Sequence, residues 1–566
     1  MKGCGKRSAP GFVAGFLLFA LGFIPAGAKA DNHDFLWLRT AGGSGAEVSR
    51  QIVVDDAGSS YIVGEFNSTN LPFGSIVLTN TLPSSLSTWD GFIVKYDSSG
   101  NVVWAKKFGG TNDDRGSSIA VDNQHNCYVT GWFDSTNFYI DGVTLTNYSP
   151  NGNSSLFVAK FDAAANLLWA RGPSGGYNTS GSKIAVDSTG NCYVTGSFNG
   201  TNTFGGTNLV SRGSSDVLLL KYDPDGNLLW AQQAGGSALD GGAGIALDAS
   251  NNVYLLANIR STNAAFGSFV FSVIGTYICQ NMVVAKYDPA GNVIWAKQYG
   301  GTSLDAGTSI VVDKSTNCYI TGSASSTNLF FGSIVLTNNY NLLIGTAVFV
   351  VKLDDCGNAL WAKAAQGNNT VSSQGIAVDQ AGNSYIAGYF QCDYLVFDTM
   401  TLTNTEPDPF GGGPADAFVA KFDAYGNLLR VVQPVGTNDQ RAFSIAVDSA
   451  ANVYITGWTQ GTNVLFGSFA TTNAYLDMFV AKIDPDYPVL QIEPASDLGV
   501  SMPGGGVVVS WPINKTGYSG FTLESSPDLV TWGPAQLFEN IIGGDRYYLV
   551  VEMSGDHNFY RLRLSN

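Results

Sequence analysis

Four acidic residues are the first candidates for a functional site in this sequence. Each lies five residues before an isoleucine that begins an apolar, β-branched segment, and the four are Glu47, Asp114, Asp240 and Asp305. Converging carboxylates are ligands for a cation such as calcium, and they also attract basic ligands. The alternative is that each acid caps the Gly-rich turn in front of its segment, and we favour that alternative.

Motifs for catalysis or metal binding are otherwise missing from the sequence. The three histidines, His33, His125 and His557, have no Cys, His or Asp at the spacing of metal ligands. There is no Ser-containing nucleophile elbow. The Asp-Pro-Asp-Gly segment that starts at Asp223 begins like a calcium loop but lacks the bidentate Glu of such a loop. We therefore expect no catalytic residues, no metal ligands and no cofactor beyond the calcium considered for the four acids.

Seven lysines occupy the same place in a repeated segment, and an Asp follows each of them two residues later. They are Lys95, Lys160, Lys221, Lys286, Lys352, Lys421 and Lys482. A catalytic lysine would be unique in the chain. Seven equivalent copies therefore indicate a polar cluster with a structural role.

Three tryptophans, Trp89, Trp132 and Trp458, do not follow the repeat uniformly. Aromatic rings exposed near a loop face could stack on sugars. Packing in the core or at the rim is the alternative, and we favour it because large aromatic side chains usually bury most of their surface.

These residues belong to a pattern that occurs seven times. A segment of the form Gly-Asn-apolar-apolar-Trp-Ala-Lys recurs with variations, and Arg430 takes the Trp position in the seventh copy. The six tryptophans are Trp37, Trp104, Trp169, Trp230, Trp295 and Trp361. The period is about 65 residues, which is typical of propellers and repeat arrays.

Each copy contains four short segments rich in β-branched and aromatic residues, which are expected to be strands. Tight Asp-x-x-Gly-Asn turns join the first segment to the second and the third to the fourth. Four antiparallel strands repeated seven times predict an all-β, seven-bladed propeller. A lone fourth strand at 35–40 is expected to complete the last blade and so to close the ring.

Several motifs that recur in fixed order resemble the seven-bladed β-propeller repeat (SBBP) of exported bacterial proteins. They are Ile-Ala-Val-Asp, Tyr-Val-Thr-Gly, Phe-Val-Ala-Lys-aromatic-Asp and Gly-Asn-x-x-Trp-Ala-Lys, and they cover residues 35–484. The resemblance implies a secreted or cell-surface propeller, and it brings no established catalytic residues with it.

Three parts are expected along the chain. Residues 1–30 have a positive start, an apolar run and small residues before Ala30, the pattern of a signal peptide cleaved after that residue. Residues 31–486 form the propeller. Residues 487–566 alternate apolar and polar residues and predict a small β-sandwich, similar to fibronectin type III or immunoglobulin-like modules.

Charge and composition restrict the partners. The net charge is −16, and removal of 1–30, with four basic residues and no acids, makes it −20. An acidic chain is a poor nucleic-acid binder. The mature chain has no apolar run long enough to span a membrane. We expect a monomer that is secreted or in the cell envelope.

Six cysteines follow the signal peptide. Cys127, Cys192 and Cys318 occupy equivalent places in different copies and are expected to lie too far apart for a disulfide. They are interpreted as small, buried apolar residues. The sequence leaves the disulfide state of the six open.

The predicted function is a scaffold without catalysis that binds an extracellular protein or a glycan. Its partner is expected on the face that carries the variable connections, with the four acids nearest the mouth of the channel. A propeller enzyme is the alternative, either a quinoprotein-like dehydrogenase or a carbohydrate-active enzyme. No two cysteines are adjacent, and no non-repeated pair of carboxylates was found, which disfavours both.

Overall fold

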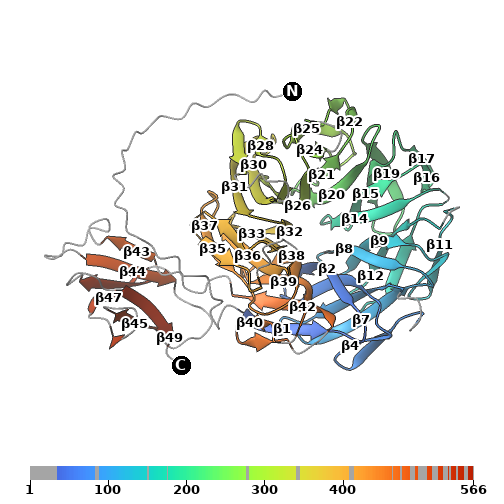
Figure 1. Ribbon diagram of the computed structural model, residues 1–566. Coiled ribbons are helices and arrows are strands. Elements are labelled where there is room, and N and C mark those ends of the chain that lie inside the picture. Colours follow the sequence, from blue (N-terminus) through green and yellow to red (C-terminus); the bar gives the residue numbers. More distant parts are fainter. Residues whose placement is uncertain are drawn as a thin grey trace.

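The computed structural model describes residues 35–484, apart from gaps at 83–87, 150–151, 175, 276–278, 339–344, 399, 407–412, 462 and 472–474. Beyond residue 484 it describes seven strands. The regular elements of the described residues are all β-strands, and those of 35–484 surround a central channel (Figure 1). The expected signal peptide lies outside the described residues. No helix in the described part is long and apolar enough to cross a membrane.

Seven antiparallel sheets form the blades, each with four strands counted outward from the channel. The innermost strands are β2 (Glu47–Val54), β8 (Asp114–Val121), β14 (Thr179–Val186), β20 (Asp240–Leu247), β26 (Asp305–Val312), β32 (Val371–Val378) and β38 (Gln440–Val447). The second strands are β3 (Ser60–Phe66), β9 (Cys127–Phe133), β15 (Cys192–Phe198), β21 (Val253–Ile259), β27 (Cys318–Ala324), β33 (Ser384–Phe390) and β39 (Val453–Gln460).

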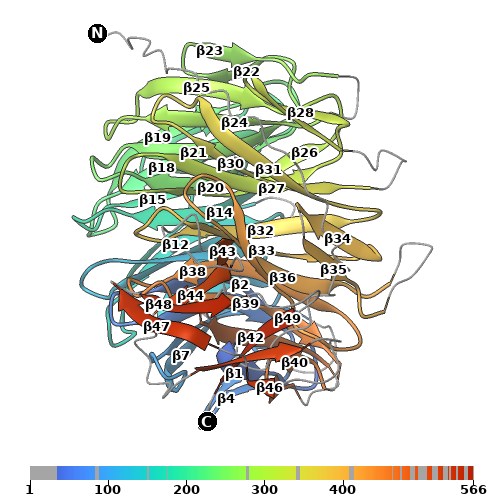
Figure 2. The same ribbon diagram turned by 90° about the vertical axis from the view of Figure 1, so that its left-hand side faces the viewer.

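The outer half of each blade completes the sheet. The third strands are β6 (Asp90–Tyr96), β12 (Ser155–Phe161), β18 (Asp216–Tyr222), β24 (Asn281–Tyr287), β30 (Ala347–Leu353), β36 (Asp416–Phe422) and β42 (Leu476–Ile483). The outermost strands are β7 (Val102–Gly109), β13 (Leu167–Arg171), β19 (Leu228–Ala234), β25 (Val293–Tyr299), β31 (Ala359–Gly367), β37 (Leu428–Val432) and β1 (Phe35–Ala41). The prediction of an all-β, seven-bladed propeller is confirmed. Figure 2 shows the ring from the side.

The outermost strand of the last blade comes from the other end of the propeller sequence. Strand β1 pairs antiparallel with β42, with Phe35 opposite Ile483 and Ala41 opposite Met478. The side chains of Phe35 and Trp37 are buried in this sheet. The last blade therefore combines three strands from the end of the repeat region with one from its beginning.

The connections between strands divide the ring into two faces. The turn face carries the Asp-x-x-Gly-Asn turns, such as 97–101 and 187–191. The linker face carries the connections between blades, such as 110–113, and the linkers between second and third strands, such as 134–154. Because every innermost strand runs from the linker face to the turn face, equivalent residues lie at the same depth in the channel.

Each linker between second and third strands contains a small hairpin that the four-strand prediction missed. The hairpins are β4 (Asn70–Phe73) with β5 (Ile76–Thr79), β10 (Asn137–Ile140) with β11 (Val143–Thr146), β16 (Thr201–Phe204) with β17 (Thr207–Val210), β22 (Ala264–Phe266) with β23 (Phe269–Phe271), β28 (Asn328–Phe331) with β29 (Ile334–Thr337), β34 (Tyr394–Phe397) with β35 (Met400–Thr403) and β40 (Leu465–Phe466) with β41 (Phe469–Ala470). Two of them extend the sheet of the preceding blade, since β10 pairs with β7 and β34 with β31.

Turn chemistry explains these hairpins. Asp141 and Gly142, between β10 and β11, have φ values of 43° and 86°. Two consecutive positive φ angles define the type I′ turn that matches the twist of a two-residue hairpin. A two-residue turn flanked by short apolar segments was therefore the available sequence signal. The strands contain only two to four residues each, too few for a clear alternating pattern.

The seven blades share one arrangement of side chains near the turn face. A tyrosine from each second strand is almost completely buried, for example Tyr193 and Tyr319. The repeated lysine places its Nζ 4.6–5.2 Å from the centre of that ring in every blade, a cation–π contact. All seven lysines thus have the same contact, as expected for a structural role. Cys127, Cys192 and Cys318 are buried thiols without a disulfide.

The repeated tryptophans join neighbouring blades. Trp169 donates a hydrogen bond from Nε1 to the carbonyl oxygen of Pro224 in the next blade, at 2.9 Å. Trp295 donates in the same way to the carbonyl oxygen of Asp355, also at 2.9 Å. Each of these indole rings also lies edge-on to a buried tyrosine of its own blade, for example Tyr128 at 6.3 Å. These repeated tryptophans therefore connect one blade to the next.

Seven short strands are described beyond residue 484. They form a four-stranded sheet in the order β43 (Gln491–Pro494), β44 (Gly506–Pro512), β48 (Arg546–Glu552) and β47 (Leu537–Gly543). They also form a three-stranded sheet in the order β46 (Gly533–Pro534), β45 (Phe521–Ser526) and β49 (Phe559–Leu564). The packing of these two sheets into a fibronectin-like sandwich stays a prediction.

Candidate functional site

Each innermost strand carries a β-bulge at the same place. In all seven blades the pairing with the second strand shifts register across the fourth residue, for example between Gly116 and Ser118. A bulge leaves one residue unpaired and re-aims its side chain. The bulged residues are Arg50, Ser117, Ser182, Ala243, Thr308, Gln374 and Phe443. Six residue types occupy this one position, so the ring loses its seven-fold symmetry here.

A cavity of about 470 Å³ lies in the channel at the level of the bulges, and we call it the linker-face chamber. Six of the seven bulged residues line it, together with Glu65, Arg115, Trp132 and Lys183. A second cavity, of about 290 Å³, is lined by residues closer to the turn-face ends of the innermost strands, including isoleucines such as Ile52 and Ile310. Lys183 and Gln374 line both cavities, so they lie at the junction between the two.

A buried carboxylate organises one side of the chamber. The side chain of Glu65, on β3, is fully buried, and its Oε1 accepts a hydrogen bond from Nε of Arg50 at 2.8 Å. Nη1 of Arg115, from the next blade, lies 3.6 Å from the same oxygen. Burial raises the pKa of Glu65, while the two guanidinium groups favour its charged form. One carboxylate therefore fixes two arginines from neighbouring blades.

Aromatic rings hold the arginines from the side. Cζ of Arg115 lies 5.0 Å from the ring centre of Trp89 and 5.2 Å from that of Trp132. Its Nη2 forms an ion pair with Asp113 at 3.3 Å. A guanidinium group this close to two indole rings gains cation–π attraction from both of them and loses conformational freedom. Arg115 is thus held in one orientation at the channel mouth.

A second arginine is held in the same way on the other side of the junction between the last blade and the first. Cζ of Arg441, on β38, lies 4.6 Å from the ring centre of Tyr389 and 5.2 Å from that of Trp458. Its Nε and Nη2 both donate to the carboxylate of Asp439 at 3.0 Å. Such a two-pronged bond orients the guanidinium plane.

These side chains come from four consecutive blades and form one continuous surface, which we call the arginine–aromatic half. Phe443 joins the groups, because Cζ of Arg50 lies 5.4 Å from its ring centre and its ring packs edge-on against Tyr389. Its members are Arg50, Arg115, Arg441, Trp89, Trp132, Tyr389, Phe443 and Trp458.

The equivalent positions of the other three blades carry small side chains. The arginine position is the second residue of an innermost strand, and the bulge is the fourth. In β14, β20 and β26 these residues are Ser180, Ser182, Gly241, Ala243, Ala306 and Thr308. At these two positions one half of the channel mouth is therefore bulky and cationic and the other half is small and neutral, and Lys183 on β14 adds a cation one residue after the bulge. Repeated architecture does not require this asymmetry, so it marks the best candidate for a site.

The four acids predicted from the sequence lie at the starts of β2, β8, β20 and β26, and all are buried. Oδ2 of Asp114 accepts hydrogen bonds from the backbone N–H of Gly110 at 2.5 Å and from Oγ of Ser135 at 2.7 Å. The equivalent donors are Gly43 and Ser68 for Glu47, Gly236 and Ser261 for Asp240, and Gly301 and Ser326 for Asp305. This is the geometry of the capping alternative.

Burial also affects the ionisation of Glu47, Asp114 and Asp305. It raises the pKa of Glu47 and of Asp114 to about 7, against opposing hydrogen bonds, and it raises the pKa of Asp305. The four side chains do not gather within reach of one metal ion, since the group in the described residues that meets this condition lies elsewhere. A ligand-binding role for the four acids stays a prediction.

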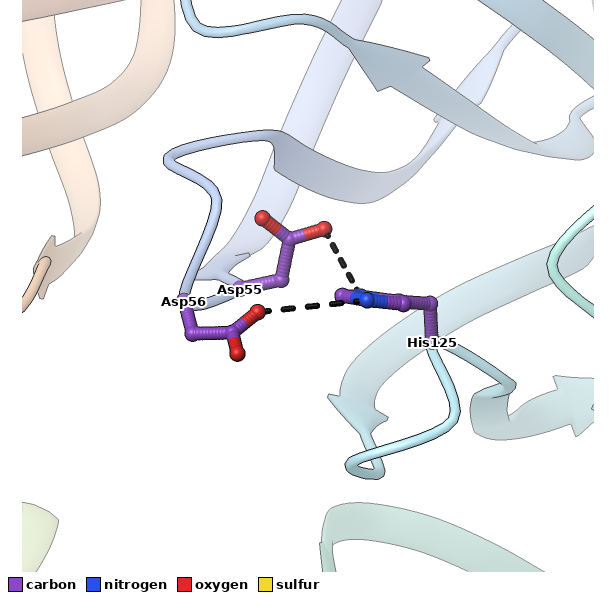
Figure 3. A group of neighbouring side chains, drawn as sticks. All are labelled: Asp55, Asp56 and His125. Atoms are coloured by element: carbon purple, nitrogen blue, oxygen red, sulfur yellow. Dashed lines mark ion pairs between the residues drawn. The ribbon is translucent and has the colours of Figure 1, made fainter.

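The group that does lie within reach of one ion consists of Asp55, Asp56 and His125 on the turn face (Figure 3). Oδ2 of Asp55 lies 3.2 Å from Nδ1 of His125, and Oδ1 of Asp56 lies 3.9 Å from Nε2. Asp55 already accepts a backbone hydrogen bond from Ser59 at 2.8 Å and lies 3.8 Å from Nζ of Lys95. These bonds belong to the turn that every blade repeats, so the group gives no independent sign of a bound ion.

Sequence reasoning identified part of the channel mouth. The structure brings two of the three irregular tryptophans, Trp89 and Trp132, together around Arg115 and places Trp458 against Arg441. The arginines themselves were missed. Their signal was available, because the second and fourth residues of each innermost strand are small or uncharged in most copies and arginine in only three cases.

Comparison with known proteins supports the repeat architecture. Four segments, 103–139, 294–330, 364–389 and 436–463, match the SBBP β-propeller repeat. A WD repeat-containing protein of Acanthamoeba polyphaga mimivirus is 26% identical over 436 residues, which is 65% of this chain and 31% of that protein. The regulatory protein FlaEY of Caulobacter vibrioides is 25% identical over 339 residues, 55% of this chain and 34% of that protein. The chain thus spans about a third of the length of these relatives.

Among solved structures, Sqt1 from Chaetomium thermophilum aligns over 85% of this chain and 97% of its own, with 7% identity and a TM-score of 0.36. That similarity is too weak to bear on either fold or function. The repeat matches and the seven sheets around the channel agree with each other. The chain therefore carries SBBP β-propeller repeats within a seven-bladed propeller.

Proposed function

We propose that this propeller is a non-enzymatic interaction scaffold that binds a protein partner at the linker face, through the arginine–aromatic half of the channel mouth. The observation that carries the proposal is the concentration of three arginines against aromatic rings, at positions where the other blades have uncharged residues, mostly Ser, Gly or Ala. Trp, Tyr and Arg are enriched among the residues that contribute most to protein interfaces. A similar WD repeat-containing protein fits an interaction role.

Rigid presentation supports this proposal. Loops held on a stable frame are common binding sites, and here the side chains stand on strands and on linkers anchored by hairpins. Arg115 and Arg441 are each held by two aromatic rings and an acid. Because their rotamers are already restricted, less conformational entropy is lost when a partner binds.

The lining of the chamber disfavours an enzyme. Hydrolysis of glycosides by the common mechanisms needs two carboxylates about 5 to 9.5 Å apart. Of the residues that line the chamber, Glu65 is the one acid, and it is held by two arginines. We propose that the chain acts by binding and that it acts outside the cytoplasm, as the signal-peptide pattern of 1–30 predicts.

The test is comparative capture with the full chain. Immobilised protein is exposed to envelope and medium extracts of the cells that produce it, beside the Arg115→Ser variant and a turn-face control, Lys314→Ser. Serine is the natural residue at the Arg115 position in β14 and β32, as Ser180 and Ser372. We expect a set of proteins retained by the wild type and the control and lost by Arg115→Ser. Identical retention by all three would overturn the proposal.

Export is tested separately by N-terminal sequencing of the protein recovered from the medium and from the envelope. We expect the mature chain to begin at Asp31. Recovery in the cytoplasm with an intact N-terminus would show that the chain is not exported.

A further inference from the structure

The linker-face chamber is a cationic site in an acidic protein. Arg50, Arg115 and Lys183 line it with Glu65 as the one acid, so its lining carries two net positive charges, against −16 for the whole chain. A cavity with low-dielectric walls concentrates the field of the charges within it. A positively charged cavity in a protein whose net charge is negative indicates a site for an anionic group.

Lys183 is the unpaired charge of this set. It lies at the fifth position of β14, at the junction of the two channel cavities, and no ion pair or hydrogen bond is found for its Nζ among the described residues. Burial, and then the positive charge of Arg50, lower the pKa of Lys183 to about 8. A lysine that lowers its pKa for want of a counter-ion gains free energy when an anion arrives.

The two arginines share one carboxylate within the chamber lining, and Arg115 also pairs with Asp113 outside that lining. Glu65 is shared between Arg50 and Arg115, and its contacts use one oxygen, Oε1. Nε of Arg115 and Oε2 of Glu65 are buried and have no hydrogen-bond partner in the part of the chain that the structure describes. Gln374, Thr308 and Ser182 add neutral polar groups at the same level of the channel. The chamber therefore offers charge and hydrogen-bond donors together.

The chemistry of the rim favours an acidic peptide over a sugar. Sugars stack on free aromatic faces, but the rings of Trp89, Trp132 and Tyr389 each have a guanidinium group placed against them. What these rings present to a ligand is therefore a set of fixed arginines, the natural partners of carboxylates. A cavity of about 470 Å³ has room for a few side chains of a loop or tail, not for a folded domain.

We propose that the linker-face chamber binds a carboxylate from an acidic segment of a protein partner, with Arg50 and Lys183 as its charged contacts and Gln374 as an additional hydrogen-bond donor. This rests on the proposed function, because it names the chemistry of the partner at the same mouth. The acidic segment enters from the linker face, past Arg115, and its carboxylate neutralises Lys183.

The primary experiment is isothermal titration calorimetry of the full chain with hexaglutamate, with hexaglutamine as the neutral control. Lys183→Ser and Arg50→Ser place at each position a residue that other blades carry there, Ser118 and Ser309 for the first and Ser117 and Ser182 for the second. Both variants should therefore fold, and circular dichroism checks this. Lys314→Ser on the turn face is the matched loss of one positive charge.

Hexaglutamate should bind the wild type and Lys314→Ser equally, and each chamber variant should weaken it by about tenfold or more, since a charge-assisted hydrogen bond is lost. Glu65→Gln should strengthen it, because the internal competitor for the two arginines becomes neutral. Equal binding by Lys183→Ser and the wild type would overturn the proposal. Binding of hexaglutamine as tight as that of hexaglutamate would also overturn it.

A third probe, a galacturonic acid hexamer, separates the source of the carboxylate. If it binds with the same dependence on Lys183 while hexaglutamate does not, the site is for acidic glycans and the proposal is wrong. The two proposals fail differently. Partners lost by Arg115→Ser without any hexaglutamate binding would leave the scaffold function intact and refute the acidic segment. Hexaglutamate binding without any captured partner would support the acidic-ligand site and refute the scaffold function.

Discussion

The two faces of the ring use the same seven-fold frame in opposite ways. On the turn face, each blade repeats one buried tyrosine with one lysine over its ring. On the linker face, the bulge that all seven blades share carries six different residue types. We infer that the repeated residues stabilise the ring and that the proposed binding depends on the residues that depart from the repeat. A substitution on the first face should therefore act on folding, and one on the second face on binding.

The largest effect is expected where the repeat is completed by the other end of the chain. Removing Phe35–Ala41 takes away β1, exposes the edge of β42 and loses the burial of Phe35 and Trp37. Burial of each large apolar side chain contributes about 1.5–3 kcal/mol, and an open edge also promotes aggregation. We expect loss of the cooperative melting transition by calorimetry. A chain that lacks only residues 1–34 is the control, and equal melting of the two truncated chains would refute a role for β1 in holding the ring.

The next effect tests the repeated cluster of the turn face. Tyr193→Ala should lower the free energy of unfolding by about 3–5 kcal/mol, because it leaves a cavity between two blades. Tyr319→Ala should cost about the same, since the site is equivalent. Urea titrations followed by tryptophan fluorescence give both values. A large difference between the two variants would contradict the idea that the blades contribute equally.

Capping of the blade connections is expected to contribute less. Asp240→Ala removes the acceptor for Gly236 and Ser261 and should destabilise the ring by about 1–3 kcal/mol, the cost of buried donors without partners. Asp240→Asn keeps one acceptor oxygen and should cost less. Calcium, titrated into the wild type, should not change the melting temperature. A calcium-dependent rise that Asp240→Asn abolishes would instead establish the acids as a cation site.

A pH dependence follows from the same acids. Burial raises the pKa of Asp114 to about 7 in the folded state, so between about pH 4 and pH 7 the native protein binds more protons than the unfolded chain. Stability should therefore fall as the pH rises through this window. Asp114→Asn should reduce the slope without abolishing it, because burial raises the pKa of Glu47 and Asp416 to about 7 as well. Unfolding free energies measured at pH 5 and at pH 7.5 give the comparison, and an unchanged slope would contradict it.

The fold was largely readable from the sequence because its determinants are local and repeated. The Asp-x-x-Gly-Asn turns join strands that are neighbours in the sequence. The tyrosine of the second strand and the tryptophan of the fourth lie in the hairpins that these turns form. The small hairpins in the linkers were missed because their strands are too short for an alternating pattern. The C-terminal strands are described, and their packing stays a prediction.

The channel mouth was harder to predict for a different reason. Arg50 and Phe443 are in contact although almost the whole ring separates them in sequence, and only the meeting of first and last blades brings them together. The bulge adds a one-residue offset that decides which side chain faces the channel. Neither the contact nor the offset leaves a local motif. The candidate acids were chosen for their chemistry and for their place in the connections between blades, and capping was the favoured alternative. The structure shows the hydrogen bonds from backbone N–H groups that capping requires.

The smallest effect on stability should accompany the clearest effect on binding. Arg441→Ser removes a partly exposed guanidinium group whose ion pair with Asp439 is of the kind that contributes about 0–1 kcal/mol. The substitution also removes the cation–π contacts of this arginine with Tyr389 and Trp458. We therefore expect an unfolding free energy within about 1 kcal/mol of the wild type and loss of captured partners. If the variant instead melts like Tyr193→Ala, the arginine–aromatic half is a structural brace and the distinction between the two faces fails. If stability and partner binding are both unchanged, the interface lies elsewhere on the linker face.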